Sequence, residues 1–491
     1  MSPLQERGGG AAPPLSRKDI RRIFYALMMG GFLSAVNQTI VASALPTIGR
    51  ELDDFQNLSW VIIAYLLSST VVAPLYGKLS DIHGRRVMML VALGLFIAGS
   101  ALSAVASSMA VLIAGRVLQG IGGGGITPMV QTTVADMVAP RERGRYQAYM
   151  GTAWIAAGVV GPVLGGVIAD KWHWSWIFWL NVPLGLCAAW LSSTAMKRLP
   201  PQGRSHRLDI IGASLMILAA VALLLVLTSG GTRVPWISST ILVLLLLSIV
   251  FTLGFSWWLH RVDEPFLPLG VLANPVMRVG TTATSCALGM MTGFMIYMPL
   301  YYQVVHKLSA TQSGLALVPV IVLTTPGSML SGRAMMHLPH YKISPTIGMT
   351  LATIAVAALA CWPEMQLGWV IFITGVIGLG VGSVFPIATV SIQNAVERRD
   401  VGTATGAMNF FRALASALVV AIMGAILLAG LGVTPERGGI GVELTVTQAG
   451  ASGVAVGQVF RYVFVAALAV SIIGLVAVIL LEERPLHGPA A

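Results

Sequence analysis

The sequence predicts an all-α polytopic membrane protein whose fourteen transmembrane helices are arranged as six, two and six. The first observation is composition: 56% of the 491 residues are hydrophobic, 10% are charged, and the mean hydropathy is +0.82. A soluble protein carries about 25% charged residues. The second is the distribution of Lys and Arg among the loops. The third is a pair of apolar segments near the middle of the chain that contain almost no polar residues.

Fourteen segments are long and apolar enough to cross a bilayer, which takes about 20 mostly apolar residues. The first follows the basic stretch 17–22 and is too long for the apolar core of a signal peptide, so we expect it to be retained. The expected helices are residues 23–46, 58–77, 87–107, 109–138, 145–169, 175–195, 208–229, 236–259, 279–303, 311–335, 345–361, 367–394, 402–431 and 458–481.

Lys and Arg are concentrated in alternate connections between these helices. With both termini inside, the cytoplasmic segments hold 22 of the 30 basic residues and the outer segments hold six. This excess predicts a multi-pass protein of the cytoplasmic (inner) membrane with both termini in the cytoplasm. The net charge of +11 then reflects orientation in the bilayer, and we expect no nucleic-acid partner.

The connections also suggest how the chain is divided. We expect a cytoplasmic tail at 1–22, a six-helix bundle at 23–195, a basic loop with two inserted helices at 196–260, a second six-helix bundle at 261–481 and a cytoplasmic tail at 482–491. The two inserted helices are almost free of polar residues. Residues 432–457 are Gly-rich and polar, and we interpret them as an outer loop.

The connection between the second and third helices contains a particular pattern of small and charged residues. Its members are Gly77, Asp81, Gly84, Arg85 and Arg86. The glycines suit a tight turn, Asp81 can face a helix N-terminus, and the arginines can anchor at the inner surface. A basic turn that merely obeys the positive-inside rule is the simpler interpretation, but the spacing is more specific than that rule requires.

This loop resembles the signature of the major facilitator superfamily. The whole chain resembles the fourteen-span drug/proton antiporter branch of that family, the multidrug exporters of EmrB/QacA type. Six further segments match, each weak alone but strong in their order: Arg116–Gly122, Gly158–Gly166, Trp176–Gly185, Pro299–Gln303, Gln393-Asn394 and Asn409–Arg412.

The resemblance implies alternating access, in which two six-helix bundles rock about a central cavity. It also implies that Asp81 latches the cytoplasmic face, and the start of the thirteenth helix, near Val401 to Thr405, is an expected partner because its amides are free. The fifth helix resembles the antiporter signature of exporters through Gly158, Gly161, Pro162, Gly165 and Gly166. Small-residue packing between helices is the alternative explanation of that motif.

Polar residues at membrane depth mark a candidate site, because they cost free energy unless they face protein or water. Asn37 and Gln38 lie in the first helix; Asn37 is ~14 Å from its outer end and Arg116 is ~10 Å from the outer end of the fourth helix. Gln119 follows one turn later, so we expect a cluster of Asn37, Arg116 and Gln119. Arg116 faces the cavity in one interpretation and extends toward the outer surface in the other.

A second arginine lies at membrane depth. Arg412 is ~15 Å into the thirteenth helix, and it is either a charge that faces the cavity or a structural arginine.

Flexible and aromatic side chains suit the wall of a cavity for varied apolar ligands, although ordinary packing explains any one of them equally well. The candidates are Trp154, Met291, Met295, Tyr297, Tyr301, Gln303 and Asn409.

Position 37 departs from the family pattern. The family generally has an aspartate in this frame of the first helix, whereas this chain has Asn37, whose amide does not titrate. No Asp or Glu falls in the interior of any expected helix. Either the cavity is electropositive and favours anionic or neutral substrates, or Asn37 replaces an aspartate, or coupling uses a peripheral acid such as Asp136.

We therefore expect a secondary active transporter that exports small amphipathic compounds, with protons as the coupling ion. The alternative is a facilitator, or an exporter of anionic metabolites or lipids, without proton coupling. A non-transporting sensor is a third hypothesis. We expect no enzyme activity, cofactor or metal site, because no nucleotide loop, nucleophile–base pair or ligand cluster is visible in the sequence. A monomer is expected, and a periplasmic adaptor is a partner by analogy only.

Overall fold

The structure is a computed structural model that describes residues 16–199, 208–231, 233–431 and 456–486. Within these residues, 14 helices are long and apolar enough to cross a membrane, and the only β-type pairing is an isolated bridge between Gly230 and Val234. The predicted all-α fold with fourteen spans is confirmed. Residues 432–455 of the predicted outer loop and parts of both tails and of the basic loop lie outside the described residues.

The first half of the chain supplies six spans, of which the sixth is built from consecutive short pieces. They are α1 (Arg17–Glu51), α2 (Trp60–His83), α3 (Arg85–Ala104), α4 (Met109–Met137), α5 (Pro140–Lys171), and α6 (Trp176–Trp179) followed by α7 (Asn181–Ala195) and the 3-10 turn η1 (Met196–Arg198). The two plain apolar spans follow as α8 (Ile210–Ser229) and α9 (Ser239–Leu259).

The second half supplies six more spans and three short elements. They are α10 (Leu269–Ala273), α11 (Pro275–Val304), α12 (Ala310–Ala316), α13 (Val318–His337), α14 (Ile343–Cys361), α15 (Leu367–Ala395), η2 (Arg398–Asp400), α16 (Val401–Gly430) and α18 (Val456–Leu480). Each of the fourteen spans overlaps one predicted segment.

Local signals in the sequence fix where several spans begin. Asn274 caps α11 by accepting a hydrogen bond from the Val276 amide at 2.9 Å, and Pro275 occupies the first helical position, where its missing N–H costs nothing. Ser108 and Ser238 cap α4 and α9 in the same way. The predicted boundaries are too short at the end of α2, which reaches His83, and at both ends of α1, which starts at Arg17 and continues through Pro46 to Glu51. A proline can lie within a membrane helix because neighbouring groups satisfy the carbonyl it leaves free.

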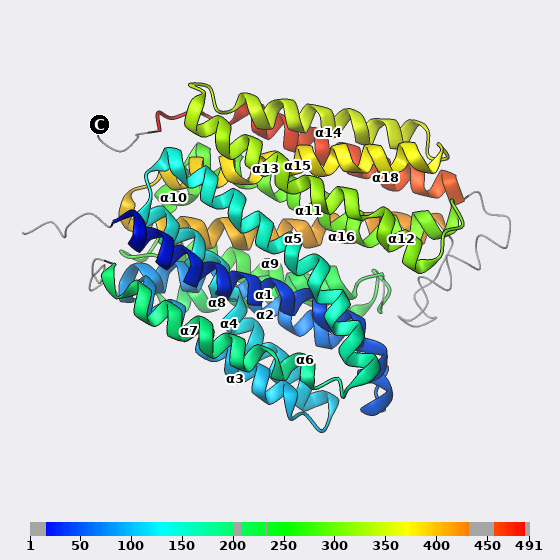
Figure 1. Ribbon diagram of the computed structural model, residues 1–491, viewed down its shortest axis with the longest axis horizontal. Coiled ribbons are helices and arrows are strands. Elements are labelled where there is room, and N and C mark those ends of the chain that lie inside the picture. The colour runs from blue at the N-terminus through cyan, green and yellow to red at the C-terminus, as the bar shows by residue number, and fades with distance from the viewer. Residues whose placement is uncertain (1–15, 200–207, 232, 432–455, 487–491) are drawn as a thin grey trace, which may run out of the picture.

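The helices of the two halves lie in two groups (Figure 1). The helices α1 to α4, α6 and α7 occupy the lower part of the view, and α11, α13 to α16 and α18 the upper part, while α5 crosses from the upper left to the lower right. The inserted helix α8 packs along the boundary, since its Met216 and Ala220 share a buried apolar cluster with Val71 of α2 and Met408 of α16. The start of α1 and the end of α18 lie at the same end of the molecule.

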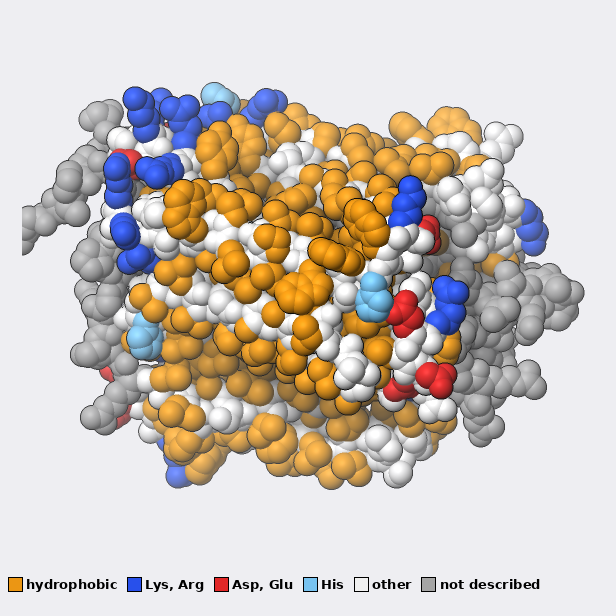
Figure 2. Space-filling model, turned by 60° about the horizontal axis from the view of Figure 1, so that its bottom comes forward, with side chains coloured by type: hydrophobic (Ala, Val, Ile, Leu, Met, Phe, Trp, Pro, Cys, Tyr) orange, Lys and Arg blue, Asp and Glu red, His pale blue; other side chains and the backbone are white. Residues whose placement is uncertain are grey.

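Figure 2 shows a broad hydrophobic band across the middle of the molecule, as a bilayer-spanning surface requires. Lys and Arg gather at the left end in that view, and the few acidic side chains seen on this face lie mainly toward the other end. We call the left end the basic end; it contains the α2–α3, α4–α5 and α15–α16 connections. The basic side chains of alternate connections thus lie together at one end of the molecule.

Candidate functional site

The structure brings Asn37, Arg116 and Gln119 together inside the first half of the chain. Gln119 donates from Nε2 to Asn37 Oδ1 at 2.9 Å, and Arg116 donates from Nη1 to Gln119 Oε1 at 2.5 Å and to Asn37 Oδ1 at 3.3 Å. Gly99 of α3 allows this approach, because a Cβ there would lie 2.2 Å from the Gln119 amide nitrogen. Gln38 is half-buried and makes none of these contacts.

Arg116 is enclosed, with 2% of its surface exposed. Its Nε donates to the Val61 carbonyl of α2 at 2.8 Å, and its guanidinium carbon lies 4.4 Å from the centre of the Tyr65 ring. Both sequence-based interpretations placed this charge against water, in a cavity or at the surface. The structure instead surrounds it with carbonyl acceptors and an aromatic face, and no acidic side chain of the described residues pairs with it.

The contacts of Asn37 are one-sided. Its Oδ1 accepts from Arg116, from Gln119 and, at 3.2 Å, from Asn181 Nδ2 at the start of α7, whereas its buried Nδ2 has no partner. The opposite assignment of the amide would point three donors at a donor, so the hydrogen-bond network fixes the orientation. This environment demands an acceptor-only group, which is what a carboxylate is.

The glycine-containing loop joins the two halves at the basic end. Asp81 Oδ2 accepts from both the amide and the Oγ1 of Thr403, each at 2.8 Å, in the first turn of α16. Arg85 pairs with Asp81 at 2.6 Å and with Asp136 of α4 at 2.8 Å. Asp81 therefore meets the helix N-terminus expected from the sequence, where free amides favour a carboxylate.

The other residues of this loop have separate structural tasks. A Cβ at Gly77 would lie 2.4 Å from the Gly402 carbonyl oxygen, so only glycine permits this approach of α2 to α16. Gly84 has a φ of 87°, the left-handed region that favours glycine, between α2 and α3. Arg86 donates from Nε to the Ser193 carbonyl at 3.1 Å and so ties α3 to α7.

The motif in α5 divides between two faces of the helix. A Cβ at Gly161 would lie 1.9 Å from Thr39 Oγ1, and one at Gly165 would lie 2.2 Å from Ser43 Oγ, so these two glycines pack α5 against α1. A Cβ at Gly158 or Gly166 would meet nothing within 4 Å, and Pro162 is exposed. Packing explains only the first pair.

A second polar network connects the two halves between α4 and α16. The sequence did not indicate that these side chains meet. Asn409 of α16 donates from Nδ2 to Gln131 Oε1 of α4 at 2.7 Å, and Arg412 donates from Nη2 to Asn409 Oδ1 at 2.5 Å. Gln393 of α15 donates to Thr405 Oγ1 at 3.3 Å. Gln131 could be found only by knowing which faces of α4 and α16 meet.

The remaining cavity candidates fall in different surroundings. Trp154 and Met295 are exposed, by 44% and 38%, and Met291 and Gln303 are half-buried. Tyr297 donates to the Val420 carbonyl at 2.9 Å. Tyr301 differs from the expectation: it is fully buried against Phe460 and Phe464, because its aromatic body fills the core of the second half while its hydroxyl bonds the Pro363 carbonyl at 2.5 Å.

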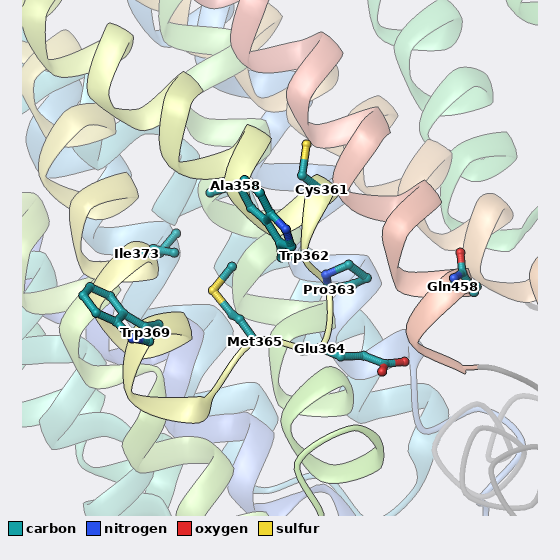
Figure 3. Close-up of a pocket in the computed structure, with 9 residues that line it drawn as sticks. All are labelled: Ala358, Cys361, Trp362, Pro363, Glu364, Met365, Trp369, Ile373 and Gln458. Atoms are coloured by element: carbon teal, nitrogen blue, oxygen red, sulfur yellow. The ribbon is translucent and has the colours of Figure 1, made fainter.

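An open pocket of about 630 Å³ lies at the end opposite to the basic one, between the α14–α15 connection and the start of α18. Figure 3 shows Glu364 extending toward the segment that carries Gln458, with Trp362 and Met365 beside it. None of the predicted site residues lines this pocket. Among the described residues, no group of three or more His, Cys, Asp or Glu could hold a metal ion.

Comparison with known proteins agrees with this architecture. The family model described as Major Facilitator Superfamily matches residues 27–420. The chain is 32% identical to an uncharacterized MFS-type transporter of Mycobacterium tuberculosis, over 99% of this chain and 72% of that protein. It is 31% identical to the multidrug transporter protein MdtP of Bacillus subtilis, over 82% of this chain and 74% of that protein.

Among solved structures, that of a human organic anion transporter superposes with a TM-score of 0.63. It covers 94% of this chain and 99% of the human one at 16% identity, a level at which only the fold is shared. The fourteen spans and the matched family model lead to one conclusion: the chain belongs to the major facilitator superfamily and is a multi-pass membrane transporter.

Proposed function

We propose that this transporter exports small amphipathic compounds across the cytoplasmic membrane by alternating access. One observation carries the proposal: the halves are joined at the basic end, through Asp81 with Thr403 and Gln131 with Asn409. Toward the other end, Gly158 and Gly166 of α5 face open space. Polar contacts that join the halves near one end are what one of two alternating states would present.

The direction of transport rests on further support. The excess of Lys and Arg favours the cytoplasm as the side of the basic end. In that orientation the described contacts close the cytoplasmic side. The resemblance of the α5 motif to the antiporter signature favours export, as does the name of the Bacillus subtilis relative. A monomer suffices for this mechanism, since both halves belong to one chain.

Flux into proteoliposomes tests transport directly. The purified protein would be reconstituted and offered three fluorescent amphipaths, one cationic, one neutral and one anionic. We expect at least one to cross faster than in protein-free liposomes, and Asp81→Asn to reduce that flux by about tenfold because it weakens the charged contact with α16. Asp170→Asn, at an exposed acid on α5, is the matched control and should leave flux unchanged.

Flux no faster than in protein-free liposomes for all three compounds would favour the non-transporting sensor. If the flux were equal in wild type and Asp81→Asn, the latch would be the part of the proposal to abandon.

The coupling ion divides the proposal into two candidates. Asn37 has no titratable group, and its partner Arg116 has no carboxylate beside it, which favours transport without proton coupling through α1. Proton antiport through a peripheral acid is the other candidate, and Asp136, bonded to Arg85, is the acid to examine. Flux measured with and without a pH gradient separates them. Equal flux supports the uncoupled transporter, and acceleration that Asp136→Asn abolishes supports antiport.

A further inference from the structure

We propose that Arg412, together with Asn409 and Gln131, forms a subsite that binds the carboxylate of an anionic amphipathic substrate. The proposal rests on the transport function above and names a substrate class for it. Arg412 lies eleven residues after Val401, so ~17 Å along α16 from the basic end, close to the middle of the bilayer.

The hydrogen bonds of Arg412 leave most of its donors unused. The described contacts give it one bond, from Nη2 to Asn409 Oδ1 at 2.5 Å, while its Nε is buried without a partner. No acidic side chain among residues 16–199, 208–231, 233–431 and 456–486 forms an ion pair with it. A guanidinium at this depth is costly unless its charge and its donors are matched.

A structural arginine would be expected to find acceptors of its own, and Arg116 shows how this chain provides them. Arg116 bonds the Val61 carbonyl, Gln119 and Asn37 and lies over the Tyr65 ring. Arg412 bonds no backbone carbonyl in the described contacts, and its guanidinium carbon lies 5.9 Å from the centre of the Phe385 ring, at the outer limit of a cation–π contact. The protein therefore supplies Arg412 with fewer acceptors than it supplies Arg116. A substrate carboxylate could fill this gap, because it can bind a guanidinium group through two parallel hydrogen bonds.

Because Arg412 lies next to the contact between the two halves, a ligand bound to it can affect that contact. Asn409 accepts from Arg412 through Oδ1 and donates through Nδ2 to Gln131 on the opposite half. A carboxylate that takes the Nη2 donor competes with Asn409 Oδ1, and this releases the side chain that bridges the halves. Arg412 is itself half-buried, so the subsite is not sealed on all sides.

A pair of dyes that differ only in a free carboxylate tests this class. Rhodamine B is a zwitterion with a free carboxylate, and its ethyl ester keeps the same cationic ring system without the carboxylate. Fluorescence polarisation would report their binding to the purified full chain. We expect rhodamine B to bind about tenfold more tightly than the ester, and Arg412→Gln to remove that preference while the ester binds as before.

Two further variants keep the test decisive. Arg412→Lys retains the charge without the planar guanidinium group and should give an intermediate preference. This variant tests the subsite even if Arg412→Gln does not fold. Ser416→Ala, one turn along α16 at a residue bonded to Thr292, is the matched control and should bind both dyes as wild type does.

Equal binding of the two dyes to wild type would overturn the subsite, and so would a preference that survives in both Arg412 variants. Selective binding of rhodamine B without flux in proteoliposomes would support the subsite while contradicting the exporter. The two proposals therefore fail separately.

Discussion

Two arginines lie at membrane depth in this transporter, one in each half, and their surroundings are opposite in kind. Arg116 is enclosed by α1, α2 and α4, with three hydrogen bonds and an aromatic ring beneath it. Arg412, on α16, has one hydrogen bond and a buried Nε without a partner. Neither pairs with a carboxylate of the described residues. A buried arginine without a counterion can thus have its donors bonded to neutral acceptors, as in Arg116, or keep donors that a ligand can bind, as in Arg412.

The difference follows from the helices that carry the acceptors. The groups around Arg116 all come from the same half, so they keep their places when the halves move. The single acceptor of Arg412 is bonded across the boundary to Gln131, so it moves with the seal. Under the proposed alternating access, Arg116 would therefore stay within a fixed support, whereas Arg412 would lie at a moving interface.

The largest expected effect is a difference in stability between two matched substitutions. Arg116→Leu takes the Arg116 donors away from the Val61 carbonyl and Gln119 Oε1 and removes one of the three donors to Asn37 Oδ1, and we expect a loss of about 3–5 kcal/mol in the free energy of unfolding. Arg412→Leu removes a poorly matched charge, so its cost should be about 1 kcal/mol or less. Thermal unfolding of the purified variants in detergent measures both. Equal destabilisation by the two substitutions would contradict the conclusion that Arg116 is bonded within the fold while Arg412 has unused donors.

Position 37 offers the next largest effect, in the opposite direction. Asn37→Asp keeps an acceptor for Arg116, Gln119 and Asn181, removes the orphaned Nδ2 donor and adds a counterion, so we expect a gain of about 1–3 kcal/mol. Asn37→Leu is the matched control, and it should be destabilising because it removes the acceptor. If the aspartate variant unfolded at a lower temperature than wild type, the site would not be suited to a carboxylate.

A smaller effect than that at position 37 is expected at Asn409. Asn409→Ala removes the acceptor of Arg412 and the bond to Gln131, and these groups lie at a boundary that must open, so we expect a loss of about 1 kcal/mol. Gln119→Ala removes three bonds inside the first-half cluster, with Arg116, Asn37 and Ser100, and should cost more, about 2–3 kcal/mol. The order of the two unfolding temperatures checks this, and the reverse order would place the more rigid network in the second half.

The sequence predicted the spans well because apolar length is a local property. It also predicted the grouping of Asn37, Arg116 and Gln119, since helical rise places all three at similar depth. It missed Asn181, which donates to Asn37, and Ser100 of α3, whose Oγ accepts from Gln119 Nε2 at 2.7 Å, because depth alone does not tell which neighbouring helices turn toward the cluster. The bond between Gln131 and Asn409 was missed for the same reason, as it depends on how two distant halves meet.

Residues chosen for size and flexibility were the least predictable. Tyr301 and Trp154 have the same kind of side chain for a cavity wall, yet Tyr301 lies in the core of the second half and Trp154 is exposed. Rotation of a helix about its axis decides between these outcomes, and an aromatic residue fits either. The α5 glycines show this too, since adjacent Gly165 and Gly166 lie on packed and open faces respectively.

Distance measurements between spin labels test alternating access most directly. In a background without the native cysteines, one pair would join Arg141 to His337 across the basic end, and another would join Lys171 to Leu315 toward the opposite end, all at exposed positions. On addition of a transported compound, we predict that a population appears in which the first distance is longer and the second is shorter. Distances that stay fixed at both ends, while the compound is transported, would contradict the movement of the halves.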